Sequence, residues 1–432
     1  MSDPFPSNIR GQARAIESGS LRSEQLVRDC LDKAVAREGE LHAWAYLGRD
    51  EALQEARQRD QQPRLGPLHG IPIAIKDLSD TATMPTGYGS PAYSNHRPVM
   101  DAACVALARA AGAVILGKTA TVEFGATRPC ATVNPHNRRH TPGGSSAGSA
   151  AVVADGQVLL ATGTQTGGSI IRPAAFCGAV GFKPSFGALS PAGTKGYAWS
   201  LDTLGLFAAC VADAALFFGV LRGEFEPPSL AEDISSPRIG VFLGPFAAQA
   251  ENAAVAALER VASRCSQAGA SIRPVAAVPG FEHSLDWQRT ISRYEMGRSM
   301  LPELQARPTA LGPILLREIE EGRGVDDARY LRAKASAAEL AYRVDALLRD
   351  HDVLLTLATP GEAPEGLGTT GDATFNLSWS LLGLPCLSLP VAIGPNRLPL
   401  SVQLIGARHA ERALLSAAGW IERSFFNTWQ SL

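Results

Sequence analysis

Hydrophobic residues recur at helical spacing in the first part of the chain. Between residues 20 and 60, the stretch SLRSEQLVRDCLDKA places Leu21, Leu26, Val27 and Leu31 at near-helical intervals behind Ser23, a candidate N-cap. This pattern predicts helices that serve as scaffold.

The pattern then changes to short apolar runs that are typical of buried strands. The run from Ile71 to Ile75 ends in a Lys-Asp pair at 76 and 77. Further on, DAACVALARAAGAVILGKT predicts a helix, a stop at Gly112 and a buried strand over 113–116. Helices that alternate with buried strands indicate an α/β sheet.

The second half of the chain carries fewer chemical signals. Residues 216–372 are more charged and more helical in pattern and contain no chemical motif, so we expect them to serve packing and substrate shaping. The Gly/Pro-rich stretch 361–372 predicts a loop, and LLGLPCLSLPVAI and LPLSVQLIG after it predict two returning strands.

Composition is that of an ordinary globular chain. The 432 residues are 45% hydrophobic and 19% charged, which is enough for a large core in one α/β unit or in two domains. A formal net charge of -2 gives no global field that would draw the chain to nucleic acid or to an anionic membrane, so a small-molecule substrate fits better. The N-terminus lacks a signal-peptide pattern and no 18-residue uncharged apolar run occurs, which predicts a cytoplasmic protein.

Cysteine and histidine patterns argue against disulfides and metals. The seven cysteines include no C-x-x-C pair, so we expect reduced and mostly buried thiols. The eight histidines form no H-E-x-x-H or H-x-H cluster, so we expect no metal and no cofactor.

Two short motifs suggest other chemistry. Residues 112–119, GAVILGKT, match the P-loop pattern, but their variable residues form an apolar strand pattern rather than a glycine-rich turn. Residues 144–148, GSSAG, match the nucleophile elbow of an α/β-hydrolase with Ser146 as nucleophile, but the residues before them form a polar turn. Neither His351 nor His409 lies in a convincing context for a catalytic partner.

Three longer segments together are similar to one family. GIPIAIKD at 70–77, TPGGSSAGSAA at 141–151 and GTQTGGSIIRPAAFCG at 163–178 resemble the amidase signature family, and the resemblance covers essentially the whole chain. It implies an α/β fold: a mixed, twisted β-sheet flanked by helices on both faces, built as a single large domain. We divide that domain into N-terminal helices (1–65), a catalytic core (66–215), a variable helical region (216–372), and returning strands with a C-terminal helix (373–432).

The resemblance also implies catalytic roles. The nucleophile is Ser169, Ser145 bridges from a cis peptide after Gly144, and Lys76 is the base. An amide is a poor electrophile, so the attacking hydroxyl must lose its proton, and a lysine accepts that proton only if burial favours its neutral form. The apolar strand that ends in Lys76 favours such burial.

The T-G-G-S segment offers an oxyanion hole. The backbone N–H groups of Thr166, Gly167, Gly168 and Ser169 follow one another and can receive the negative oxygen of a tetrahedral intermediate. We expect a bulky residue at either glycine to impair the reaction severely.

The chain departs from the family pattern at two positions. Gln165 stands where many members have an acid, and the arginine falls three residues after the nucleophile, at Arg172. This is similar to the malonamidase-like subgroup, in which the arginine holds a substrate carboxylate; the alternative is that Arg172 ties loops together. Gln288, Arg289 and Arg293 are weaker candidates for substrate contact.

The sequence thus predicts an amidase that hydrolyses a small carboxamide to a carboxylate and ammonia or an amine, with a substrate carboxylate left open. One alternative is the glutaminase component of a tRNA-dependent amidotransferase, which passes ammonia to a partner. The other is an α/β-hydrolase-type esterase that uses Ser146. As partners we expect a small-molecule amide, no nucleic acid and no membrane, with a homodimer left open.

Overall fold

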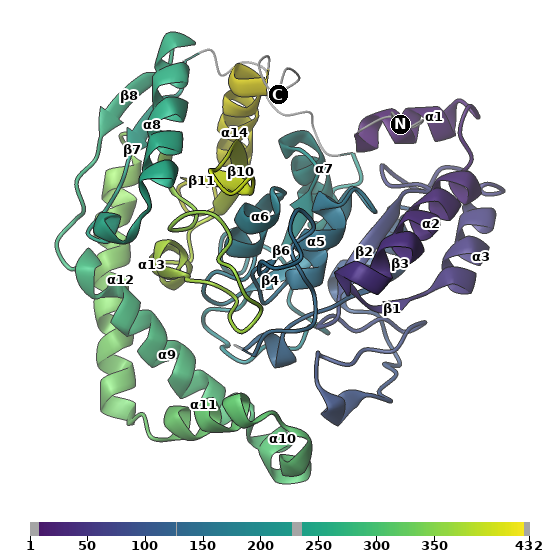
Figure 1. Cartoon of the computed structure of the whole chain (residues 1–432), viewed down its shortest axis with the longest axis horizontal. Helices are drawn as coiled ribbons and strands as arrows, with labels where there is room; N and C mark the ends of the chain where they lie inside the picture. The colour runs from purple at the N-terminus through teal and green to yellow at the C-terminus, as the bar shows by residue number, and fades with distance from the viewer. Residues whose placement is uncertain (1–7, 127, 227–235, 427–432) are drawn as a thin grey trace.

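One large sheet organises the chain. A computed structural model describes residues 8–126, 128–226 and 236–426, and its strands form an 11-stranded sheet in the order β1-β3-β2-β4-β6-β5-β10-β11-β9-β7-β8 (Figure 1). The strands are β1 (Trp44–Leu47), β2 (Pro72–Lys76), β3 (Val114–Thr119), β4 (Leu160–Gln165), β5 (Val180–Lys183), β6 (Thr203–Ala208), β7 (Arg238–Val241), β8 (Ser271–Pro274), β9 (Val353–Leu357), β10 (Cys386–Ile393) and β11 (Pro399–Ile405).

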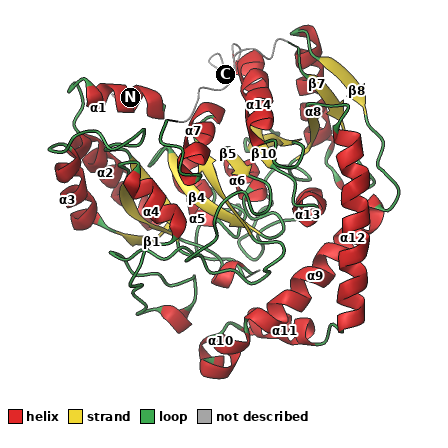
Figure 2. Cartoon of the chain, turned by 180° about the vertical axis from the view of Figure 1, so that it is seen from behind, coloured by secondary structure: helices red, strands yellow, loops and turns green. Residues whose placement is uncertain are grey.

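Helices surround this sheet (Figure 2). They are α1 (Ile9–Glu17), α2 (Ser23–Leu41), α3 (Arg49–Arg59), α4 (Ala103–Ala110), α5 (Ala147–Ala154), α6 (Ile171–Cys177), α7 (Val211–Leu221), α8 (Asn252–Gln267), α9 (Ser284–Ser299), α10 (Leu301–Ala306), α11 (Pro313–Arg323), α12 (Asp327–Leu348), α13 (Thr374–Leu381) and α14 (Glu411–Phe426). Short 3₁₀ turns are η1 (Pro91–Tyr93), η2 (Glu123–Gly125), η3 (Ala247–Gln249), η4 (Phe281–His283) and η5 (Pro308–Ala310).

Strand β5 shows that helices cover both faces of the sheet. Side chains of successive strand residues point to opposite faces. A side chain at Gly181 would meet Ala174 of α6, whereas the ring of Phe182 packs edge-on against Phe218 of α7 at 5.2 Å between centroids. The expected single-domain α/β fold, a mixed sheet flanked by helices, is therefore confirmed.

The predicted strands around the catalytic core are also confirmed. The run at 71–75 begins one residue before β2, whose five residues are all buried, and the run at 113–116 begins one residue before β3. Strand β2 pairs in parallel with both β3 and β4, and parallel strands present their carboxyl ends at one edge. Lys76, Thr119 and Gln165 end these three strands, so the topology brings them to the same edge.

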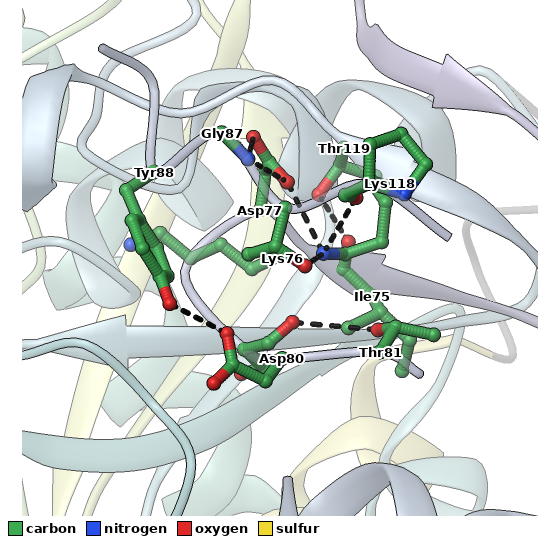
Figure 3. Close-up of polar contacts among 12 residues, drawn as sticks. Ile75, Lys76, Asp77, Asp80, Thr81, Gly87, Tyr88, Lys118 and Thr119 are labelled. Carbon is green, nitrogen blue, oxygen red and sulfur yellow. Dashed lines mark hydrogen bonds and ion pairs between the residues drawn. The ribbon is translucent and has the colours of Figure 1, made fainter. Parts of the chain in front are cut away.

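The segment that matches a P-loop is part of the sheet. Residues 114–119 form β3, and the ammonium of Lys118 is buried, 3.1 Å from a carboxylate oxygen of Asp77 and 2.6 Å from Thr86 Oγ1. Figure 3 shows Asp77 between Lys118 and the backbone nitrogen of Gly87, which donates to the same carboxylate at 3.0 Å. The lysine of the motif is thus committed to an internal ion pair rather than to a phosphate.

This ion pair yields a prediction about stability. Lys118→Met removes the cation and leaves the Asp77 carboxylate buried without its charge partner, which should cost about 3 to 5 kcal/mol of unfolding free energy. Urea denaturation measures the loss. The double variant Asp77→Asn/Lys118→Met should recover part of it, and a double variant no more stable than Lys118→Met would contradict the charge argument.

The variable region forms an arm at one side of the molecule. Helices α9 to α12 extend away from the sheet on the side opposite α1 to α3, as Figures 1 and 2 both show. The range 216–372 also supplies β7, β8 and β9 to the sheet. The two strands expected near the C-terminus are β10 and β11, an antiparallel pair, and α13 precedes them.

The remaining general expectations concern cysteines and membranes. All seven cysteines are free thiols, and five are buried, as predicted. Within 8–126, 128–226 and 236–426, no helix is both long and apolar enough to span a bilayer. The cytoplasmic location stays a prediction.

Candidate active site

Lys76 lies at the centre of the site, and its side-chain hydrogen-bond partners among the described residues are all hydroxyl groups. Its side chain is fully buried at the end of β2, and its Nζ donates to Ser145 Oγ at 2.9 Å, Ser146 Oγ at 2.8 Å and Thr164 Oγ1 at 2.7 Å. Burial lowers the pKa of Lys76 to about 7, because the ammonium loses its hydration, while the charge of Asp202 acts in the opposite direction. A lysine in this state can exchange a proton near neutral pH.

Two contacts fix the backbone around Ser145. The Gly144-Ser145 peptide is cis, as the resemblance implies. The Gly144 carbonyl accepts from Arg172 Nη2 at 2.7 Å, and the Ser145 carbonyl accepts from the Val122 N–H at 3.2 Å. These two hydrogen bonds fix the carbonyl groups of Gly144 and Ser145, and so fix the backbone that presents the Ser145 hydroxyl to Lys76.

Ser169 lies on the loop between β4 and α6, beside the other two residues. Its side chain is nearly buried, and its carbonyl accepts from the Ser146 N–H at 3.3 Å. In the part of the chain that the structure describes, no hydrogen bond joins the hydroxyls of Ser145 and Ser169. The structure thus brings Lys76 and Ser145 into contact, and it joins Ser169 to Ser146, the residue that follows Ser145.

The loop from Thr166 to Ser169 is tied down through its carbonyl oxygens. Gln288 Nε2 donates to the Thr166 carbonyl at 3.1 Å, Ser380 Oγ donates to the Gly167 carbonyl at 2.5 Å, and the Arg172 N–H donates to the Gly168 carbonyl at 2.9 Å. None of the four backbone N–H groups of this loop donates to another described residue. This is compatible with the predicted oxyanion hole, which stays a prediction.

Gln165 uses both ends of its amide to support this loop. Its Oε1 accepts from the N–H groups of Ile170 at 2.8 Å and Ile171 at 3.0 Å, and its Nε2 donates to Ser380 Oγ at 2.9 Å. A carboxylate at this position could only accept. The departure from the family pattern at Gln165 therefore links the loop to α13 through Ser380.

The two glycines of the loop differ in their surroundings, which gives a prediction. A Cβ at Gly168 would lie 2.6 Å from Asn376 Oδ1, whose amide is anchored to the Ala358 carbonyl. A Cβ at Gly167 would crowd the flexible end of Leu377, at 2.8 Å, and would lie at an ordinary 3.7 Å from Gln288 Nε2. Gly168→Ala should lower kcat by about 10²- to 10³-fold, because the oxyanion donors are displaced. Gly167→Ala, the matched control, should lose less, and equal losses measured by steady-state ammonia release would contradict this account.

A cavity of about 340 Å³ opens beside the site. Thr164, which accepts from Lys76, and Thr166, the first residue of the loop, both line it. The rest of its wall is largely apolar and aromatic, with one cation, Lys195, that is 2.5 Å from Glu303. The lining residues are Leu78, Phe124, Gly125, Thr164, Thr166, Phe186, Gly187, Leu189, Pro191, Thr194, Lys195, Gly196, Tyr197, Trp199, Asp202, Thr203, Leu204 and Ser299.

The other candidate residues have structural partners or lie outside. Arg172 is buried and donates to the carbonyls of Gly144 and Gly371, each at 2.7 Å, so its geometry favours the loop-tying alternative. Arg289 is exposed, and Arg293 pairs with Glu321 at the surface. Of the three weaker candidates, Gln288 alone reaches the loop.

Ser146 does not have the environment of a nucleophile elbow. It precedes α5, but the segment before it is a loop rather than a strand, and the side chain is fully buried. Its hydroxyl accepts from Lys76 and donates to the Thr164 carbonyl at 3.3 Å. The structure therefore gives Ser146 a supporting position behind Lys76.

Sequence reasoning missed Asp202, Thr164 and Ser380. Asp202 stands directly before the apolar run of β6, and Lys76 ends the apolar run of β2. A charged residue beside a buried strand was the reason to single out Lys76, and it could have singled out Asp202 as well. Thr164 and Ser380 carry no signal of their own, because their role depends on contacts between distant segments. No cluster of three or more His, Cys, Asp or Glu in the described ranges is arranged to hold a metal.

The fold and this site define a class of enzyme that cleaves amide C–N bonds. The family model described as Amidase matches residues 25–415, and the chain belongs to that family. One curated relative, the A subunit of glutamyl-tRNA(Gln) amidotransferase from Cyanothece sp., is 33% identical and aligns over 93% of this chain and 94% of its own length.

Solved structures agree on the fold. A chain from a vestigial protein complex that reveals the evolutionary origins of an s-triazine catabolic enzyme is 31% identical, with a TM-score of 0.88 over 95% of this chain and 96% of that one. The peptide amidase from Stenotrophomonas maltophilia is 28% identical, with a TM-score of 0.82 and 98% of each chain covered.

The comparisons correct the expected partners. Sequence reasoning predicted a small-molecule amide without nucleic acid, and left open a homodimer. Relatives from several bacteria are named as one subunit of an enzyme for glutamyl-tRNA(Gln). The partner prediction is therefore wrong: near-zero net charge was a poor guide, because net charge bears on non-specific attraction and not on the assembly that a chain joins.

Proposed function

We propose that the chain is the amide-hydrolysing subunit of an assembly, and that it releases ammonia from a carboxamide through an acyl-enzyme on Ser169. The observation that carries the chemistry is the contact of 2.9 Å between buried Lys76 and Ser145, beside a loop with four unused N–H donors. The subunit role is supported by the relatives that are named as one component of glutamyl-tRNA(Gln) amidotransferase.

In this mechanism, Ser169 Oγ attacks the carboxamide carbon, and its proton passes to Ser145, which passes its own proton to neutral Lys76. The N–H groups of the 166–169 loop stabilise the oxyanion. The C–N bond then breaks, and the leaving nitrogen takes a proton back through Ser145 and departs as ammonia. Water attacks the acyl-enzyme by the same relay, which frees the carboxylate and restores Ser169.

The side-chain carboxamide of glutamine is the proposed substrate. It yields glutamate and ammonia, which matches the amidotransferase role of the relatives. A role for Arg172 in holding the substrate carboxylate, as in malonamidase-like enzymes, has less support, because two nitrogens of that guanidinium already donate to backbone carbonyls.

Two measurements test this proposal. Ammonia release from glutamine should exceed release from matched neutral amides, and Arg172→Lys should not alter the ratio. Affinity purification from the source cell should recover a second subunit in a fixed ratio. Turnover of neutral amides alone, by a chain that purifies without a partner, would replace the proposal with a free-standing amidase.

A further inference from the structure

Asp202 lies where the cavity meets the catalytic loop. Its carboxylate lines the cavity and accepts from the N–H groups of Tyr197 at 2.7 Å and Ala198 at 2.9 Å, and from the hydroxyl of Thr166. A Cβ at Gly196 would lie 2.3 Å from a carboxylate oxygen, so the turn before Tyr197 wraps closely around this group. The carboxylate is therefore held in one position.

Thr166 is the residue through which Asp202 reaches the reaction. It is the first of the four residues with unused N–H groups, and its carbonyl is bound from the other side by Gln288. Asp202 thus fixes the side chain of Thr166, and Gln288 fixes its backbone. Together they determine how the start of the loop is presented to the cavity.

The charge of Asp202 also acts on the catalytic lysine. The Asp202 carboxylate acts to raise the pKa of Lys76 against the larger effect of burial, and Cys130 would act in the same direction only as a thiolate. Burial raises the pKa of Asp202 itself to about 6, with Glu295 adding to the effect, and the Thr166, Ala198 and Tyr197 donors oppose it. The three donors that face this carboxylate favour its ionised form.

Two further groups complete the electrostatic surroundings. Burial raises the pKa of the Tyr197 phenol, and the charge of Asp202 adds to the effect, so this phenol stays neutral. Lys195 lines the same cavity but is paired with Glu303. Neither the neutral phenol of Tyr197 nor the ammonium of Lys195 supplies a negative charge that could act on Lys76 in place of Asp202.

We propose that Asp202 is a positioning residue for amide cleavage: by holding the hydroxyl of Thr166, it orients the start of the loop that carries the oxyanion donors. This inference rests on the proposed function of Ser169, Ser145 and Lys76. It assigns a catalytic effect to a residue that contacts neither the nucleophile nor the base through a hydrogen bond.

The test compares Asp202→Asn with Thr166→Val in the same ammonia-release assay. Asp202→Asn keeps the size of the side chain but removes the charge and replaces one acceptor by a donor. We expect kcat to fall by about 10- to 100-fold with KM changed less than about threefold. The acidic limb of the kcat/KM profile should move to lower pH by at least about half a unit, because neutral Lys76 then persists at lower pH.

Thr166→Val separates the two effects, because it removes the hydroxyl contact but keeps the charge. It should lower kcat and leave the acidic limb in place, and it tests positioning even where Asp202→Asn fails to fold. An unshifted limb together with kcat within twofold of wild type in Asp202→Asn would overturn the inference. Retained activity in Ser169→Ala would instead overturn the proposed function.

Discussion

Ser169→Ala should abolish turnover. Without the hydroxyl no acyl-enzyme forms, and the remaining oxyanion donors act only on direct attack by water, so the loss of kcat should reach about 10⁴-fold or more. Steady-state ammonia release measures it, and circular dichroism should show an unchanged fold, because the side chain makes no hydrogen bond to another described residue.

The matched control is Ser146→Ala. If Ser146 were the nucleophile of an esterase-type elbow, its loss would match that of Ser169. Because Ser146 instead supports Lys76 and Thr164, we expect a loss of about 10-fold. Mass spectrometry of enzyme quenched during turnover should find the acyl group on the peptide that holds Ser169, and an acyl group on Ser146 would exclude the proposed mechanism.

Lys76→Met should abolish activity and yet stabilise the fold. The pKa of Lys76 falls from 10.5 to about 7 on burial, which disfavours the folded state by on the order of 4 kcal/mol at and below neutral pH. Methionine removes this cost but leaves three hydroxyls without their donor, at about 1 kcal/mol each. A net gain of about 1 kcal/mol at pH 7 remains.

The pH dependence of the unfolding free energy tests this variant more sharply than its stability at pH 7 alone. Between pH 7 and 10.5, unfolded wild type still binds the lysine proton while folded wild type does not, so wild-type stability should rise with pH in that window. Lys76→Met lacks this contribution, and its advantage should shrink as pH rises. Urea denaturation at several pH values measures the difference, and parallel pH profiles for both proteins would show that Lys76 keeps an ordinary pKa.

The same lowered pKa predicts the activity profile. Neutral Lys76 is the required base, so kcat/KM should rise with pH through about 7 and then level off.

Sequence predicted those parts of the site that lie at the ends of single elements. The apolar run before Lys76 indicated a strand buried on both faces, and all five residues of β2, Lys76 included, are indeed buried. The apolar strand pattern of residues 113–116 also distinguished Lys118 from the lysine of a true P-loop. The glycines before Ser169 marked a loop whose backbone could approach a substrate.

Local pattern could not predict the contacts that hold this loop. Ser380 lies 215 residues from Gln165, and Gln288 lies 122 residues from Thr166. Nothing near Gln288 distinguishes it from any other glutamine on a charged helix. Arg172 shows the opposite difficulty: its position suggested an anion site, but only the fold revealed the carbonyls that it binds.

These long connections have a consequence for the order in which refolding produces working enzyme. Contacts between residues far apart in sequence form late, because the chain between them must first lose its freedom. The loop bearing Ser169 is held by β4, α9 and α13, so it reaches its final shape only after the arm and the C-terminal third have docked. Recovered activity should therefore lag behind recovered helical content, which makes catalysis itself a reporter of the last step of folding.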